Sequence, residues 1–203
     1  MGSKSFAIVL LILIFSLFSC SDTAPKIMSL YPQVVYDVEE EELYLSTYAS
    51  FISDPMRIDS MEICHVESHL VWYCDSLERI LSTDKKSEYV GYSAFVPAEN
   101  GFPAGEYEVT FYDGVKRTTK STFTLKKITI KKDYEQISRK KEYIAIFDEN
   151  NSILSVEKDE NKITEDKIAS TFQDAIYYRK IIQSVDDNVL YLSKKQNVSR
   201  NKD

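Results

Sequence analysis

FPAGEYEVTFYDG, residues 102–114, is the stretch that decides the fold class of this chain. From Tyr107 to Phe111 apolar and polar side chains alternate, so that one face of an extended strand is apolar. The Asp-Gly pair that ends the stretch is typical of a tight turn, and residues 118–125 follow with the same alternation. The pattern predicts a β-hairpin with one buried face.

Short strand-like runs continue from this hairpin toward the N-terminus. In residues 41–51 leucines alternate with tyrosines, which again predicts one buried face. The runs 58–66 and 70–74 flank a turn, and Trp72 shares a face with apolar neighbours, so we expect this ring in the core. Several short strands separated by turn residues are typical of an all-β fold.

The motif PAGEYEVTFYDGV, followed by FTL at residues 123–125, resembles the last hairpin of bacterial immunoglobulin-like and fibronectin type III-like domains. The resemblance implies a mainly β fold with an immunoglobulin-like β-sandwich over residues 25–132. It also implies a tyrosine corner at Tyr107, in which the ring hydroxyl bonds to nearby backbone.

Residues 133–195 are expected to form a small α+β unit with one helix. The apolar phase slips after Leu125, which favours a boundary near residue 132. Thr164 is a residue type typical of a helix N-cap, and acidic residues follow it in the expected first turn. The expected elements are a hairpin of residues 142–147 and 153–157, a helix whose apolar face runs from Ile168 to Ile176, a hairpin of residues 181–185 and 189–192, and a frayed tail at 196–203.

The first 20 residues, MGSKSFAIVLLILIFSLFSC, have the order of a secretory signal peptide. One lysine precedes a mostly apolar run from Phe6 to Phe18, and polar residues follow this run. The run is shorter than the roughly 20 residues that a membrane-spanning helix needs. We therefore expect residues 1–19 to be a signal peptide that directs export.

The segment LFSC, residues 17–20, resembles the lipobox of bacterial lipoproteins in the looser form found in spirochaetes. The resemblance implies that Cys20 is acylated, with palmitate among its acyl groups, and becomes the mature N-terminus. Residues 20–24 would then form a short lipidated tether to the bilayer. Ser21, by analogy with bacterial sorting rules, favours the outer membrane over the inner one. The expected localisation is a bacterial cell envelope.

Two cysteines, Cys64 and Cys74, remain once Cys20 carries lipid. Disulfides can persist in the compartment that receives an exported protein, and the strands expected to hold these two residues are neighbours. We therefore predict a disulfide between Cys64 and Cys74. The alternative is a pair of buried free thiols.

The composition argues against catalysis and against nucleic acid as a partner. The formal net charge is −7, and the 5 glycines are too few and too scattered for a phosphate-binding loop. Neither an H-E-x-x-H nor a G-x-S-x-G motif occurs. His65 and His69 lie near both cysteines, but neighbouring residues of a strand point to opposite faces, which disfavours a zinc site. We expect no enzyme activity, no metal and no cofactor.

Two surfaces are candidates for partner binding. Tyr44 and Tyr48 lie opposite the leucines of their strand and Tyr112 opposite its neighbouring phenylalanine, so the three rings would form one patch on an exposed sheet. The alternative is that the C-terminal unit covers these rings. The second candidate is a basic docking face for an acidic partner or anionic lipid, with a solvated strand edge as its alternative. Its lysines are Lys126, Lys127, Lys131 and Lys132.

These features together predict a lipid-anchored envelope protein that acts as a non-enzymatic binding or assembly module. Its expected partners are the bilayer, through acylated Cys20, and a protein of the envelope. One alternative is a surface adhesin or ligand-binding lipoprotein that uses the tyrosine face. Another is a hydrolase without a recognisable motif that uses two carboxylates.

Overall fold

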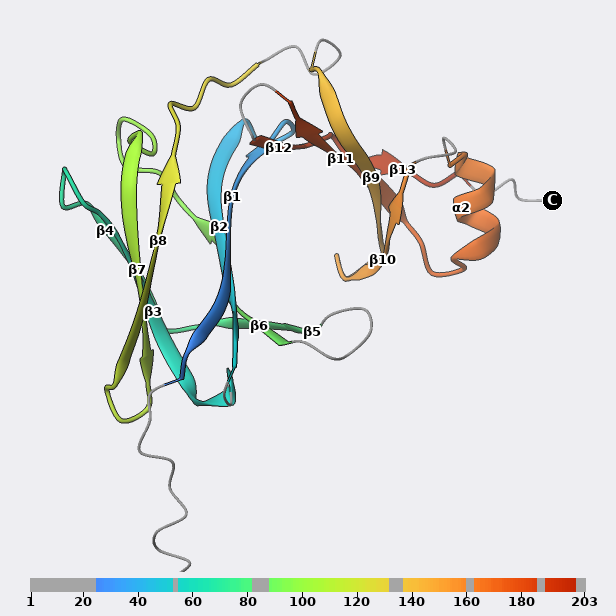
Figure 1. Cartoon of the computed structure of the whole chain (residues 1–203). Helices are drawn as coiled ribbons and strands as arrows, with labels where there is room; N and C mark the ends of the chain where they lie inside the picture. Colours follow the sequence, from blue (N-terminus) through green and yellow to red (C-terminus); the bar gives the residue numbers. More distant parts are fainter. Residues whose placement is uncertain are drawn as a thin grey trace, which may run out of the picture.

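The computed structural model describes residues 25–52, 55–81, 88–131, 137–159, 163–185 and 189–199. These residues form two β-sheets, one α-helix and one short 3-10 helix, which confirms the predicted mainly β fold. Figure 1 shows a small sheet packed against one arm of a larger, curled sheet, with the helix at the other arm. The predicted signal peptide, Cys20 and its tether lie outside the described residues.

The large sheet has nine strands and contains both the first and the last strands of the chain. Eight of them follow one another across the sheet, and the short β13 (Gln196–Asn197) pairs with β11 off this path. In spatial order the eight are β10 (Ile153–Lys158), β9 (Arg139–Phe147), β11 (Tyr177–Ser184), β12 (Val189–Leu192), β1 (Ile27–Asp37), β2 (Glu42–Phe51), β6 (Glu88–Phe95) and β5 (Glu78–Leu81).

The small sheet has four antiparallel strands. Two of them, β7 (Gly105–Asp113) and β8 (Thr118–Leu125), are the hairpin predicted from residues 102–125. The other two, β3 (Ile58–His65) and β4 (Val71–Cys74), form the hairpin predicted around residues 67–69. A 3-10 turn, η1 (Pro55–Arg57), precedes β3.

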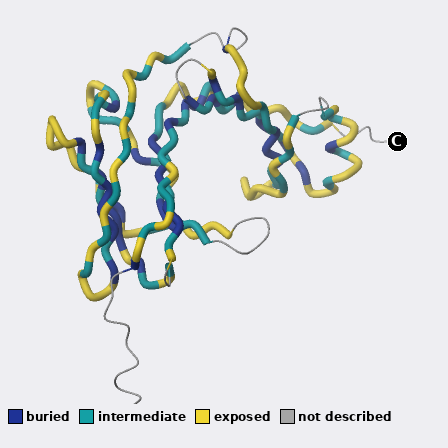
Figure 2. The backbone as a smooth tube through the Cα atoms, in the orientation of Figure 1, coloured by how far each residue is buried: buried dark blue, intermediate teal, exposed yellow. Residues whose placement is uncertain are grey.

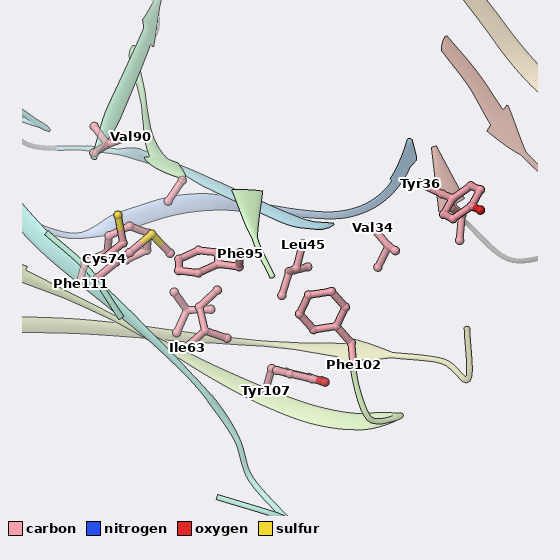
Figure 3. Packing of buried hydrophobic residues seen from close by; sticks show 14 of the residues in the cluster. Val34, Tyr36, Leu45, Ile63, Cys74, Val90, Phe95, Phe102, Tyr107 and Phe111 are labelled. Atoms are coloured by element: carbon pink, nitrogen blue, oxygen red, sulfur yellow. The ribbon is translucent and has the colours of Figure 1, made fainter. Parts of the chain in front are cut away.

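The main core lies between the small sheet and the strands β1, β2 and β6 of the large one. Leu45, Ile63, Val90 and Phe111 are fully buried there, and Figure 3 shows their side chains meeting between the sheets. The dark blue segments of Figure 2 concentrate along the same layer. Each strand contributes every second residue to this layer, as its alternating sequence predicts.

Tyr107 forms the hydrogen bond expected of a tyrosine corner. Its side chain is fully buried, and its hydroxyl donates to the backbone carbonyl of Pro103 at 2.7 Å. Trp72 packs against the same core, with ring centroids 5.6 Å from Phe102 and 6.0 Å from Tyr107. Both predictions, the backbone hydrogen bond of Tyr107 and the core position of Trp72, are confirmed.

The C-terminal residues continue the large sheet instead of forming a separate layer. Strand β12 pairs in parallel with β1, from Val34 opposite Val189 to Asp37 opposite Leu192. Strands β11, β9 and β10 then extend the same sheet. The boundary predicted near residue 132 therefore separates two stretches of chain that share one sheet.

The predicted N-cap is confirmed, but the helix is shorter than expected. Helix α2 (Glu165–Thr171) starts after Thr164, whose hydroxyl accepts a hydrogen bond from the backbone N–H of Lys167. Its buried Ile168 packs on Ile144 and Ile146 of β9. The expected continuation to Ile176 is wrong, because the chain turns at Phe172 and residue 176 is exposed.

The prediction of a frayed tail over residues 196–203 is also wrong for part of this range. Residues 196–197 form β13, and the backbone N–H of Val198 donates to the carbonyl of Ile176 at 2.9 Å. Val198 packs against the cluster that holds α2 on the sheet. Residues 200–203 lie outside the described part of the chain.

The predicted disulfide between Cys64 and Cys74 is wrong. The register of β3 and β4 places Cys74 opposite Met61 and Cys64 opposite Val71. Cys74 is buried on the core side, whereas Cys64 lies on the other face of the sheet, and both thiols are free. Three residues along a strand span about 10 Å, and a disulfide needs Cα atoms within about 7 Å.

Candidate binding surface

The large sheet has one face that neither the small sheet nor the helix covers. Figure 1 shows the small sheet on the outside of one arm of the curl and α2 on the outside of the other. We name the opposite, concave side of the sheet the inner face. Its side chains include those of Tyr31, Gln33, Val35, Tyr44, Tyr48, Tyr89, Tyr143, Tyr177, Ile181, Gln183, Leu190 and Leu192.

Strand alternation and register place these residues on the inner face. In β1 the buried Val34 and Tyr36 belong to the main core, so Val35 between them points to the other side. Val35 lies opposite Tyr44 on β2 and Leu190 on β12. Residues directly opposite each other in neighbouring strands share a face, and the inner face therefore crosses from one strand to the next.

Three tyrosines form a cluster at the β2–β6 end of the inner face. The rings of Tyr31 and Tyr89 meet edge to face, with centroids 5.5 Å apart. Tyr48 lies opposite Tyr31, and its hydroxyl donates to the carboxylate of Glu78 on β5. Burial, together with this bond to Glu78, raises the pKa of Tyr48, so its hydroxyl stays protonated. Tyr31 is 48% exposed, which leaves one ring of the cluster open to a partner.

The middle of the inner face is mostly apolar. By the same register, Asp37 and Arg179, which form a buried ion pair, and the exposed Lys141 also belong to this face. Val35, Ile181, Leu190 and Leu192 are apolar and only half-buried, and Gln183 lies beside them in the register. Partly exposed apolar side chains are typical of the centre of a protein interface, and the charges of Asp37 and Arg179 beside them neutralise each other. This composition favours contact with another molecule at the middle of the sheet.

At the β9–β11 end of the inner face, the side chains pack tightly against one another. Phe147 and Tyr177 stack with centroids 4.7 Å apart, and the ammonium group of Lys195 lies 5.0 Å from the Tyr177 ring centre. The Tyr177 hydroxyl and the Asn151 amide oxygen are 3.0 Å apart. Tyr177 is buried, so this end of the inner face offers little surface for contact and mainly holds the sheet in its shape.

A buried ion pair joins the two halves of the large sheet. The guanidinium of Arg179 on β11 donates to the carboxylate of Asp37 on β1 at 2.6 Å, and both side chains are buried. Burial alone would raise the pKa of Asp37. The hydrogen bonds from Arg179 and from the backbone N–H groups of Glu39 and Glu40 outweigh it and hold this pKa below its ordinary value.

The predicted patch of three tyrosines does not exist as one surface. Tyr44 and Tyr48 lie on the inner face, as their strand pattern predicts. Tyr112 lies on β7 of the small sheet, on the side away from the core, so the thickness of both sheets separates it from the other two. The prediction was wrong because each of the two packed sheets has its own outward face.

The alternative, that the C-terminal unit covers the rings, is also wrong. Residues 137–199 extend the large sheet at the β1 edge, and Tyr44 and Tyr48 stay half-buried. Sequence reasoning missed the other inner-face tyrosines. Tyr31 and Tyr89 alternate with core residues in their own strands, a signal that could have been found. Tyr143 joins the same face only through the order of strands in the sheet.

The predicted basic docking face stays a prediction. Lys126 and Lys127 are exposed in the extended connection after β8. The backbone N–H of Lys131 donates to the hydroxyl of Tyr191 at 3.1 Å, which anchors that connection to the large sheet. Lys132 lies outside the described residues.

His65 has a structural role in the small sheet. Its ring is buried, with Nδ1 2.7 Å from the Ser68 hydroxyl and Nε2 3.3 Å from the Ala104 carbonyl. Among the residues that the structure describes, no group of three or more His, Cys, Asp or Glu side chains could hold a metal ion. The described helices are all too short or too polar to cross a membrane.

The comparisons with known proteins give no relatives for this chain. No protein-family model matches it, and neither the curated proteins nor the solved structures contain a significant match.

Proposed function

We propose that this protein is a non-enzymatic binding module, held by lipid at a bacterial cell envelope, whose inner face contacts an envelope protein. The observation that carries the proposal is the inner face itself. It combines tyrosines on β1, β2, β6 and β9 with a mostly apolar middle, in which Asp37 and Arg179 neutralise each other in a buried ion pair. Tyrosines supply large contact area at low conformational-entropy cost, and interface centres are depleted of charge.

The shape of the large sheet supports the same proposal. A curled sheet offers a concave surface that a convex or extended partner can follow over several strands. The buried Asp37–Arg179 pair and the Phe147–Tyr177 stack fix the curl before a partner arrives. A preorganised surface loses less entropy on binding than a flexible one.

We also propose that residues 25–132 form an immunoglobulin-like sandwich. The backbone hydrogen bond of Tyr107 and the face-to-face packing of the small sheet on β1, β2 and β6 support this assignment. In such a scaffold the sheets are rigid and the exposed faces and loops carry recognition. The fold therefore suits a binding role without needing catalytic groups.

The lipid anchor is proposed from the LFSC segment at residues 17–20. Acyl chains on Cys20 would hold the module within a few residues of its bilayer. In cells fed radioactive palmitate, the wild type incorporates label and a Cys20→Ser variant does not. Label that persists in Cys20→Ser would overturn the anchor at this cysteine.

The binding role is tested by removing rings from the inner face. A Tyr31→Ser/Tyr89→Ser variant removes two exposed or half-exposed rings that contact each other. We expect it to migrate on native gels of solubilised membranes without the partner that the wild type retains. The matched control, Tyr73→Ser/Tyr112→Ser, removes two rings from the outward side of the small sheet and should retain the partner. Equal migration of both variants contradicts the proposal.

A further inference from the structure

A second feature lies at the rim of the inner face, where the main core meets the connection to the C-terminal strands, and it shares Tyr44 with that face. It is a cavity of about 540 Å³. Its walls come from the β1–β2 turn, the loop after β6 and the connection after β8. Leu43, Pro97 and Ile130 are among its apolar lining residues, one from each wall. The volume lies in the range of small-molecule sites in proteins.

Two of the three walls of the cavity are held in place by hydrogen bonds to distant elements. The indole N–H of Trp72 donates to the Val96 carbonyl at 2.8 Å, which ties the loop after β6 to the small sheet. Within that loop the backbone N–H of Gly101 donates to the Ala98 carbonyl at 2.8 Å. The bond from the Lys131 N–H to the Tyr191 hydroxyl fixes the connection beside Ile130. The cavity is therefore built by the fold and is not a gap between loose loops.

The charged groups at the cavity are three exposed carboxylates and therefore carry one sign of charge. Glu41, Glu42 and Glu99 line it, and no lysine or arginine occurs among its described lining residues. The hydroxyl of Tyr44 donates to the carboxylate of Glu42, which orients this group at the edge of the apolar wall. An apolar interior with a negative edge is complementary to a molecule that has an apolar body and one positive charge.

We propose that this cavity binds a small organic cation of the alkylammonium class. The apolar body would lie against Leu43, Pro97 and Ile130, and the ammonium group would face the carboxylates of Glu42 and Glu99. Charge-assisted hydrogen bonds from the ammonium group supply orientation, and burial of the alkyl chain supplies affinity. The cavity meets the inner face at Tyr44, but the tyrosine cluster of Tyr31 and Tyr89 takes no part in it.

The test uses three probes of equal length on the full chain in non-ionic micelles: butylammonium, butanol and butanoate. Backbone amide signals of Leu43 and Ala98 report on the cavity, and the amide of Ala175 beside α2 reports on unspecific effects. Butylammonium should shift the two cavity signals saturably and leave Ala175 unchanged. Butanol should bind about tenfold more weakly, since it lacks the charge. Butanoate should not bind.

Variants separate the contribution of charge from that of shape. Glu42→Gln/Glu99→Gln keeps the volume of both side chains and should weaken butylammonium about tenfold, to the level of butanol. Glu149→Gln, an exposed carboxylate in another part of the chain, should leave the affinity unchanged. Tyr31→Ser/Tyr89→Ser should also leave the affinity for butylammonium unchanged. Failure of the cavity proposal can therefore be told apart from failure of the proposed function.

Three outcomes would overturn the proposal. Equal affinity for butylammonium and butanol would show an apolar cavity that does not select charge. Saturable binding of butanoate would show the wrong sign of charge at the site. Shifts that never saturate, or that appear equally at Ala175, would show that no such site exists.

Discussion

Gly91 lies on β6, directly opposite Tyr48 of β2. A Cβ atom at this position would come within 2.1 Å of the carbonyl oxygen of Thr47 and 2.6 Å of the Cα atom of Tyr48. Both are backbone atoms, so a rotamer change cannot relieve the contact. The absence of a side chain at Gly91 lets β6 pair beside Tyr48 and form this end of the inner face.

A Gly91→Ala substitution should therefore destabilise the protein by about 3 kcal/mol, the upper range for overpacking. Urea unfolding followed by tyrosine and tryptophan fluorescence measures the change. Gly114→Ala is the matched control, because no atom lies within 4 Å of the Cβ it would add. That control should stay within about 0.5 kcal/mol of the wild type. Equal effects of the two substitutions would contradict the close approach.

Tyr107 gives a second residue-scale prediction. Tyr107→Phe keeps the fully buried ring and removes only the hydroxyl that donates to the Pro103 carbonyl. We expect a loss of about 1 kcal/mol, the usual net contribution of one buried hydrogen bond. The urea midpoint should fall while the slope of the transition stays the same. An unchanged midpoint would show that this hydrogen bond does not stabilise the fold.

The hydrogen-bond partner of a single residue could be predicted where that partner lies only a few residues away in the chain. The strand pattern around Tyr107 and the residue type of Thr164 each determine a nearby backbone partner, and both predictions are confirmed. The disulfide between Cys64 and Cys74 depended instead on the register of two strands. The turn at residues 66–70 sets that register, and it places the two thiols on opposite faces.

At the scale of elements, the pairing of β1 with β12 depends on a buried ion pair. Arg179 donates to Asp37 at 2.6 Å and also to the Ser193 carbonyl at 2.6 Å, so one guanidinium links β1, β11 and the end of β12. Removing one partner of a buried pair leaves an uncompensated charge. Arg179→Met should therefore cost about 3 kcal/mol or more.

The same pair predicts a pH dependence of stability. The pKa of Asp37 in the folded protein lies below the ordinary value of 3.8, so its carboxylate stabilises the folded state fully above that value. This contribution is lost as the pH falls through the lower folded pKa. The stability difference between wild type and Asp37→Asn should be constant near about pH 6 and shrink below about pH 4. Urea titrations at several pH values measure it, and a difference that does not change with pH would contradict the account.

The order of strands in the large sheet could not be predicted from the sequence. The hairpins β9–β10 and β11–β12 were found because their partners are adjacent in the chain. The parallel pair of β1 and β12 joins residues at opposite ends of the described chain. No local pattern in β1 distinguishes a strand that pairs on one side from one that pairs on both.

At the scale of the whole molecule, the shared sheet predicts how the protein unfolds. Val189 and Tyr191 of β12 belong to the main core together with Leu45 of β2, although the predicted boundary near residue 132 separates them. Ile144 and Ile168 belong to a second, smaller cluster around α2. The main core should therefore open as one unit, and the β10–β9–α2 end should open at lower free energy.

Native-state hydrogen exchange measures these opening free energies residue by residue. The amides of Tyr191 and Leu45 should exchange with the same opening free energy, and those of β10 with a smaller one. If all residues after 132 opened together, well before Leu45, the chain would instead consist of two independent units divided at the predicted boundary.

The curl of the large sheet explains why the function could be anticipated only in part. Tyr44 and Tyr48 marked an exposed face in the sequence, but the strands that complete this face come from both halves of the chain. The mostly apolar middle, with Leu190 and Ile181, exists only once β12 and β11 have joined β1. The binding surface is thus a property of the assembled sheet and of no single strand.

Site-specific photocrosslinking in intact cells tests the central claim, that the inner face contacts a partner, most directly. A photoreactive phenylalanine analogue replaces Tyr31 in one variant and Tyr73 in the other. These tyrosines are 48% and 57% exposed. Tyr31 lies on the inner face, and Tyr73 lies on the side of the small sheet that points away from the core. Irradiation should give one adduct of defined mass from position 31 and none from position 73. The same adducts from both positions, or an adduct from position 73 alone, would contradict the account.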